Sequence, residues 1–180
     1  VGIVNGVDFQ HSGLVRKVDI AGITQTLQSG SMVLLSPFGF SPTGEAFNLT
    51  MEDVAVSAAT ALRADKLIII SETPMMVDQD GDEIRELSFK QAEAELEKDY
   101  LPADASFYLE HAVKASRGGV PRIHIVPYKI DGSALLELFT HDGVGTMVST
   151  ENLESLREAT VEDVGGIIKL IEPLEADGTL

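Results

Sequence analysis

A single carboxylate inside an apolar segment is the first candidate for chemistry in this sequence. Glu137 lies within the run Ala134–Phe139, whose other members are apolar, and Gly143 and Gly145 follow shortly after it. The glycines free the backbone to turn tightly, so a helix is expected to end here and a loop to begin. A buried carboxylate is costly unless a cation or a hydrogen-bond donor meets it. Two explanations stay open: a ligand that carries an ammonium or guanidinium group, or partial exposure or an internal ion pair.

The rest of the catalytic inventory is small. The four histidines lack the spacing of metal ligands, and the chain contains no cysteine. A nucleophile elbow, a P-loop and a G-x-G-x-x-G motif are all missing from the sequence. The acidic turn Asp78–Asp82 places its glycine at the fourth rather than the sixth position and has no glutamate at the twelfth. We therefore predict no metal site.

The composition indicates a folded and strongly acidic protein. Hydrophobic residues make up 44% of the 180 positions, while 29 acidic and 13 basic residues give a net charge of -16. Binding to nucleic acid or to an anionic membrane is not expected, since phosphate recognition requires concentrated positive charge. No stretch approaches the roughly 18 apolar residues of a membrane span, and no signal-peptide pattern opens the sequence. We expect a cytoplasmic protein.

Alternating strand and helix patterns predict an α/β domain. Helices are expected at 20–28, 51–63, 88–99, 104–117, 134–139 and 160–172, and strands at 1–4, 14–18, 32–35, 67–70, 123–126, 146–148 and 156–159. The apolar strand at 32–35, the helix from Thr50 and the strand at 67–70 form a βαβ pattern, which favours a parallel sheet covered on both faces. The segment Ser36–Gly44 between them is predicted to be a long loop with a functional role.

Three segments carry a family resemblance. Residues 7–19 (VDFQHSGLVRKVD), 43–50 (TGEAFNLT) and 135–147 (LLELFTHDGVGTM) closely resemble the bacterial amino-acid N-acetyltransferases, the N-acetylglutamate synthases, and the likeness extends over the whole chain. Members of this family join an amino-acid-kinase-like domain to a C-terminal GNAT acetyltransferase domain. The resemblance implies an α/β, carbamate-kinase-like three-layer sandwich with a mainly parallel sheet, followed by the first strand and helix of a GNAT domain.

The same resemblance implies a domain division. Residues 1–148 correspond to the C-terminal part of the kinase-like domain, 149–155 to a linker, and 156–180 to the beginning of the acetyltransferase domain. On this interpretation the chain is an internal fragment of a longer protein. The catalytic residues and the acetyl-CoA site would then lie outside it.

A kinase site implied by the fold is degenerate here. Acetylglutamate kinases open the helix after the long loop with an Asn-x-Asn-x-Asp motif, and the matching positions are Asn48, Thr50 and Glu52. A lysine of the kinases corresponds to Tyr108, and by the same count Lys114 is a residue of the helix surface. Phosphoryl transfer requires placed positive charge, so we expect a kinase fold without kinase activity.

The resemblance further implies an arginine site. Glu137 and Gly143 match the glutamate and the glycine that contact L-arginine in arginine-sensitive relatives, and His124 matches a histidine close by. A carboxylate suits the cationic groups of arginine, and a glycine lets backbone carbonyls approach closely. The segment would then sense the end product of the pathway.

Taken together, these expectations define a function. The intact protein would transfer an acetyl group from acetyl-CoA, a co-substrate, to L-glutamate in the first step of arginine biosynthesis, with L-arginine as effector and a homo-oligomer, a hexamer in the family, as the assembly. The fragment itself would bind no cofactor and would be inactive. Two alternatives are an arginine-binding regulatory module without catalysis and an authentic acetylglutamate kinase.

Overall fold

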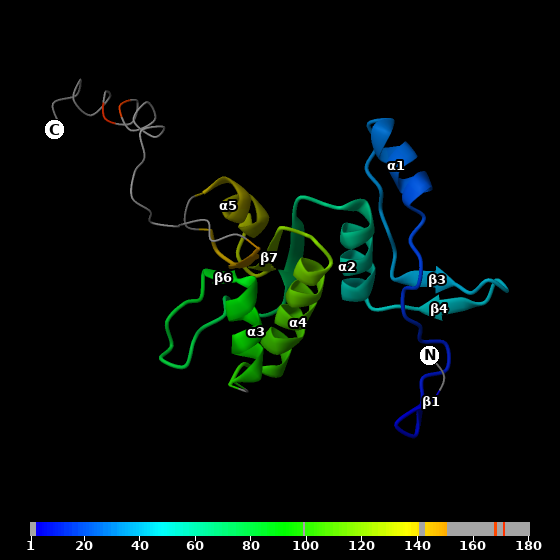
Figure 1. Ribbon diagram of the computed structural model, residues 1–180, viewed down its shortest axis with the longest axis horizontal. Coiled ribbons are helices and arrows are strands. Elements are labelled where there is room, and N and C mark those ends of the chain that lie inside the picture. Colours follow the sequence, from blue (N-terminus) through cyan, green and yellow to red (C-terminus); the bar gives the residue numbers. More distant parts are fainter. Residues whose placement is uncertain (1–2, 99, 141–142, 151–167, 169–170, 172–180) are drawn as a thin grey trace.

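The computed structural model describes residues 3–98, 100–140, 143–150, 168 and 171. A mixed sheet with helices on both faces forms the centre of the structure. The N-terminal arm, residues 3–48, lies on the far side of α2 from this sheet (Figure 1). The elements are β1 Ile3–Val4, β2 Val7–Asp8, α1 Ile20–Gln28, β3 Phe38–Phe40, β4 Ala46–Asn48, α2 Met51–Leu62, β5 Leu67–Ser71, β6 Glu86–Ser88, α3 Phe89–Glu97, α4 Ala103–Arg117, β7 Arg122–Pro127, α5 Ser133–Phe139 and β8 Thr146–Ser149.

The central sheet has four strands in the order β5-β7-β8-β6. β5 pairs with β7 in parallel and β6 with β8 in parallel, while β7 and β8 run antiparallel. The prediction of a mainly parallel sheet is therefore confirmed. The chain passes from β5 to its parallel neighbour β7 through β6, α3 and α4, so the helices of this crossover cover the sheet.

Side chains of β7 point alternately to the two faces of the sheet. Ile123 and Ile125 belong to the main hydrophobic core, which α2, α3 and α4 close from one side. Because successive residues of a strand face opposite ways, His124 and Val126 point to the other side, where α5 packs on β7. Both are buried, so the sheet forms the middle of three layers.

Local capping explains where the helices begin. Asp19 accepts a hydrogen bond from the amide of Gly22, and Thr50 accepts one from that of Asp53. Ser88 and Gln91 form a reciprocal capping box at α3. The helices predicted from these caps are confirmed to within two residues at each end.

Two predicted strands do not form. Residues 14–18 are irregular, and residues 32–35 form no regular element and join no sheet among the described residues. Met32 and Leu34 are each 97% exposed, whereas a buried strand was expected. A strand needs a neighbouring backbone, and within the described residues no backbone hydrogen bond reaches 32–35. The βαβ unit predicted across α2 is consequently absent from the described chain.

Shorter strands were missed instead. The predicted loop 36–44 contains β3 and leads into β4, and these strands pair as an antiparallel hairpin. β6, immediately before α3, was also not predicted. The expected strand at 156–159 lies outside the described residues, as does most of the helix expected at 160–172, of which Ile168 and Ile171 are helical.

Candidate functional site

Helix α5 brings Glu137 over the buried face of β7. The helix begins after Gly132, whose backbone has a left-handed φ of 68°, and ends at Thr140, whose hydroxyl donates to the carbonyl of Leu136. His124 lies at the centre of β7, with Ile68 of β5 on one side and Met147 of β8 on the other. The element predicted to end in a glycine loop is therefore confirmed.

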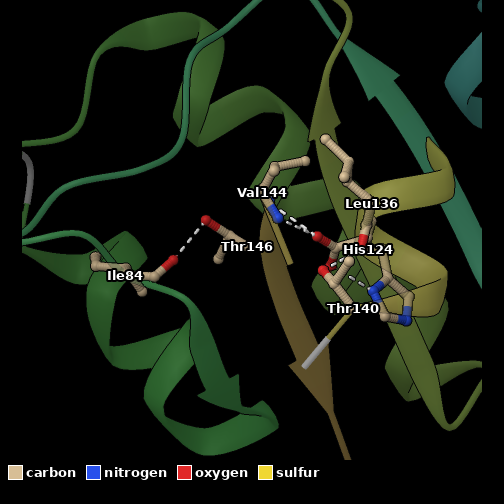
Figure 2. Close-up of polar contacts among 8 residues, drawn as sticks. Ile84, His124, Leu136, Thr140, Val144 and Thr146 are labelled. Carbon is tan, nitrogen blue, oxygen red and sulfur yellow. Dashed lines mark hydrogen bonds and ion pairs between the residues drawn. The ribbon is translucent and has the colours of Figure 1, made fainter. Parts of the chain in front are cut away.

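The carboxylate of Glu137 accepts three hydrogen bonds from the protein itself. Nδ1 of His124 lies 2.7 Å from Oε1, and the backbone amides of Val144 and Gly145 donate to Oε2 at 2.8 and 2.9 Å. Figure 2 shows these donors converging from β7 and from the loop before β8. The side chains of His124 and Glu137 are only 8% and 5% exposed, so the pair is shielded from solvent.

The charge state of this group follows from its donors. Burial alone would raise the pKa of Glu137, but the hydrogen bonds from His124, Val144 and Gly145 outweigh burial and lower the pKa below its ordinary value. An ionised carboxylate only accepts hydrogen bonds, so the proton of the shared contact is assigned to Nδ1 of His124. Nε2 of the same ring is buried and has no hydrogen-bond partner among the described residues.

Glycine is required where the loop meets the carboxylate. Gly143 has a φ of 61°, and a Cβ at this position would lie 2.6 Å from Oε2 of Glu137. At Gly145 a Cβ would press on the carbonyl oxygen of Ile125. Both glycines thus let the loop approach closely enough for its amides to reach Glu137.

The loop is fixed on its other side as well. Thr146, which is fully buried, donates from its hydroxyl to the carbonyl of Ile84 at 2.7 Å, as Figure 2 also shows. The backbone amide of Met147 donates to the carbonyl of Arg85. The start of β8 therefore lies between the Glu137 carboxylate and the segment before β6.

The structure brings together the three residues predicted for the arginine site. His124, Glu137 and Gly143 come from β7, from α5 and from the loop after it, and they meet around one carboxylate. Of the explanations that the sequence left open, an internal pair is present. Any ligand that reaches Glu137 would have to share or replace its present donors.

The amides of Val144 and Gly145 were missed as donors. Their signal was the glycine pair itself, because two glycines shortly after a buried carboxylate can place successive amides against it. From the sequence, these glycines were interpreted only as a turn and as access for a ligand. A turn that wraps back onto the preceding helix is the additional feature.

The three degenerate kinase positions stay apart in their contacts. Asn48 pairs through its backbone with residues 11–13, Glu52 lies half-exposed in the first turn of α2, and Tyr108 packs against the core from α4. No hydrogen bond or ion pair joins their side chains within the part of the chain that the structure describes. The exposed Lys114 forms an ion pair with Asp53 of α2, so its predicted place on the helix surface is confirmed.

Among the described residues, no group of three or more histidine, aspartate and glutamate side chains could hold a metal ion. None of the helices in this part of the chain has the length and apolar character needed to cross a membrane.

The mainly parallel sheet with helices on both faces places the described domain in the α/β class, whose members carry many unrelated functions. The sequence profile described as "Amino acid kinase family" matches residues 2–127, and the chain belongs to this family.

Two individual proteins are similar to this chain over nearly its whole length. The amino-acid acetyltransferase of Ralstonia nicotianae is 63% identical over all 180 residues, which cover 40% of its length. The crystal structure of N-acetylglutamate synthase from Neisseria gonorrhoeae, complexed with coenzyme A and L-arginine, is 35% identical at a TM-score of 0.85, over 96% of this chain and 40% of that one.

A more distant structure supports the fold alone. Carbamate kinase from Giardia lamblia, bound to AMP-PNP, superposes with a TM-score of 0.57 at 12% identity, over 77% of this chain and 46% of that one. The carbamate-kinase-like fold expected from the resemblance is thus confirmed. The chain spans about 40% of the length of the curated relative described above.

Proposed function

We propose that this chain is part of an amino-acid N-acetyltransferase whose complete polypeptide transfers the acetyl group of acetyl-CoA to the amino group of L-glutamate. The observation that carries the proposal is the 63% identity to an amino-acid acetyltransferase, which covers all 180 residues. In this reaction the amine attacks the thioester carbonyl, the thiol of coenzyme A leaves, and a base takes the proton from the amine. We assign the base and the acetyl-CoA site to parts of the polypeptide beyond this chain.

The proposal divides the chain as the resemblance suggested. Residues 1–148 would form the regulatory kinase-like domain, 149–155 the linker, and 156–180 the start of the GNAT domain. The complete protein would be a cytoplasmic homo-oligomer, a hexamer, in the arginine pathway. Sedimentation of the complete gene product tests the assembly independently of activity.

The Glu137 site is proposed to sense L-arginine. An ionised, largely buried carboxylate attracts a guanidinium or an ammonium group, and this one lies beside a loop that continues directly into β8. Since its oxygens already accept from His124, Val144 and Gly145, bound arginine would compete with these donors. Loss of the two amide contacts would free the start of β8, the strand that leads toward the acetyltransferase domain.

An assay of the complete gene product tests both parts. We expect release of coenzyme A from acetyl-CoA only when L-glutamate is added, at a rate that L-arginine changes. Glu137→Gln should keep the glutamate-dependent rate and lose the response to arginine, whereas Glu97→Gln on the surface of α3 should behave as the unaltered protein. A protein without glutamate-dependent release would refute the enzyme, and an undiminished arginine response in Glu137→Gln would refute the site alone.

Two alternatives make different predictions in the same experiment. A regulatory module without catalysis would bind arginine but release no coenzyme A. An acetylglutamate kinase would produce ADP from ATP and N-acetylglutamate. Glu52 and Tyr108 make this activity unexpected, because they stand where the kinases have an aspartate and a lysine.

A further inference from the structure

One asparagine of the chain is followed directly by a glycine. The three asparagines are Asn5, Asn48 and Asn152, and only Asn5 stands before a glycine, Gly6. The amide nitrogen that follows an asparagine can attack the side-chain amide carbon of that asparagine, because the ring that forms is five-membered and unstrained. A glycine places no side chain beside the attacking nitrogen, so this step is least hindered at Asn5.

The structure leaves the attacking nitrogen at this position accessible. Asn5 and Gly6 form the two-residue turn between β1 and β2, with φ values of 51° and 80°, and both residues are exposed. A Cβ at Gly6 would meet no atom within 4 Å. Among the described residues the amide of Gly6 donates no backbone hydrogen bond. The nucleophilic nitrogen is therefore open to water.

The hairpin around this turn is held by few contacts. β1 and β2 pair at only two positions and form a sheet of their own. Ile3 is 73% exposed and Val7 is 56% exposed, so the hairpin buries little apolar surface. A two-stranded hairpin of this kind is marginally stable at best in water. The turn can therefore open at low cost, which lets the side chain of Asn5 reach the geometry of attack.

Asn48 provides the contrast within the same chain. It is also exposed, but it belongs to β4 and pairs with Phe38 of β3. Its amide donates to the carbonyl of His11, and the following amide, that of Leu49, donates to the carbonyl of Pro37 at 3.0 Å. The nitrogen that would attack Asn48 is thus engaged in a hydrogen bond, and a leucine side chain stands beside it.

We propose that Asn5 is a site of spontaneous covalent modification in which water is the second reactant. The nitrogen of Gly6 forms a bond to Cγ of Asn5, the Nδ2 group leaves as ammonia with the proton of the attacking amide, and a cyclic imide remains. Water then adds to one of the two imide carbonyls and opens the ring. Opening at one carbonyl gives aspartate, and opening at the other gives isoaspartate, whose main chain runs through the former side-chain carbon.

The two products differ in their effect on the hairpin. Both add one negative charge. Aspartate is a residue type that fits a left-handed turn position, so the hairpin should persist. Isoaspartate adds a methylene group to the main chain, which a two-residue turn cannot accommodate, so it should break the pairing of β1 with β2. The modification would therefore alter the hairpin as the protein ages.

Incubation of the complete gene product at neutral pH tests the site. Peptide mass spectrometry should show the conversion of the amide to a carboxyl group at Asn5 at least about tenfold faster than at Asn48, whose strand pairing must open first. Chromatography should separate two products, and a methyltransferase specific for isoaspartate should label one of them. The rate should rise with pH, because the deprotonated amide nitrogen is the nucleophile.

Two variants separate the ring route from simple hydrolysis. Gly6→Ala should slow the conversion of Asn5, because it places a methyl group beside the attacking nitrogen, while its Cβ meets no other atom within 4 Å. Asn5→Gln keeps an amide at the exposed turn but would need a larger ring, so its conversion should also be slower.

Several results would overturn the proposal. These are equal rates at Asn5 and Asn48, aspartate as the sole product, an undiminished rate in either variant, and the absence of conversion at Asn5 in the complete gene product. Because the incubation contains no substrate, its result is independent of the acetyltransferase assay.

Discussion

The strand β7 and residues 32–35, the arm strip, were both predicted to be strands and have opposite structures. Residues 123–126 (Ile-His-Ile-Val) and 32–35 (Met-Val-Leu-Leu) each follow a helix and a glycine, and apart from His124 both segments are apolar. In β7 the four residues are at most 6% exposed, and all pair with β5 while the first three also pair with β8. In the arm strip two of the four residues are 97% exposed. The difference lies in the neighbours, because only β7 has strands beside it and helices above and below.

The comparison extends to the polar groups of the two regions. In β7 even a histidine is buried, since Glu137 accepts from one of its ring nitrogens and ionic and amide contacts satisfy the carboxylate. The backbone groups of the arm strip have no backbone partner among the described residues and are left to hydrogen-bond with water. Burial in this chain therefore follows from available partners, and four experiments measure how large that effect is.

The largest contrast should come from truncating one leucine in each region. Leu109 on α4 is fully buried in the core, so Leu109→Ala should lower the free energy of unfolding by about 2–5 kcal/mol. Leu34→Ala in the same 180-residue chain should change it by less than about 0.5 kcal/mol, since the side chain is already in water. Urea denaturation of both variants measures the difference. Comparable losses would mean that the arm strip is packed in solution.

Gly143 should show the next largest effect. Gly143→Ala places a Cβ against Oε2 of Glu137 and strains a left-handed backbone, for which we expect a loss of about 1–3 kcal/mol. Gly132→Ala is the matched control, because its φ of 68° is similar and its Cβ would meet no atom within 4 Å. Denaturation should show a smaller loss for Gly132→Ala. If both losses are equal, the Glu137 contact contributes nothing beyond backbone strain.

Sequence reasoning was most reliable where local signals sufficed. Asp19, Thr50 and Ser88 cap their helices as their residue types predict, because a cap depends on three or four neighbouring residues. The prediction of a strand at 32–35 was wrong for the opposite reason, because strand formation depends on partners that are far away in sequence. No pattern within the strip itself could show that its partners were missing.

The candidate site was predictable in part. An isolated carboxylate at Glu137 indicated that a partner must exist, and the glycines indicated a turn. The sequence could not show whether the partner was a ligand or the protein itself. His124 is thirteen residues before Glu137, and the two side chains meet only because His124 points to the face of the sheet that α5 covers. The amides of Val144 and Gly145 are invisible in side-chain patterns.

Acid should weaken the site through Glu137. Since the folded-state pKa of this group lies below its ordinary value of 4.5, its contribution to stability is present above pH 4.5 and is lost as the pH falls through the lowered pKa. Glu137→Gln should therefore flatten the pH dependence of the free energy of unfolding below pH 4.5. Denaturation across that range measures the change, with Glu83→Gln, at an exposed position between β5 and β6, as control. An unchanged acid slope would mean that His124 and the loop amides do not stabilise the charged form.

The smallest effect should come from the ion pair that joins α2 to α4. Burial alone would raise the pKa of Asp53, but hydrogen bonds from Lys114 and Thr50 lower it overall, so the carboxylate is ionised at neutral pH. The side chain of Lys114 is 56% exposed, and solvent screens its attraction to Asp53. Lys114→Met keeps the aliphatic stem and should cost only about 0–1 kcal/mol, less still in high salt, by urea denaturation at two ionic strengths. A loss as large as that of Leu109→Ala would contradict the conclusion that burial among neighbours, rather than surface charge pairing, holds the two helices together.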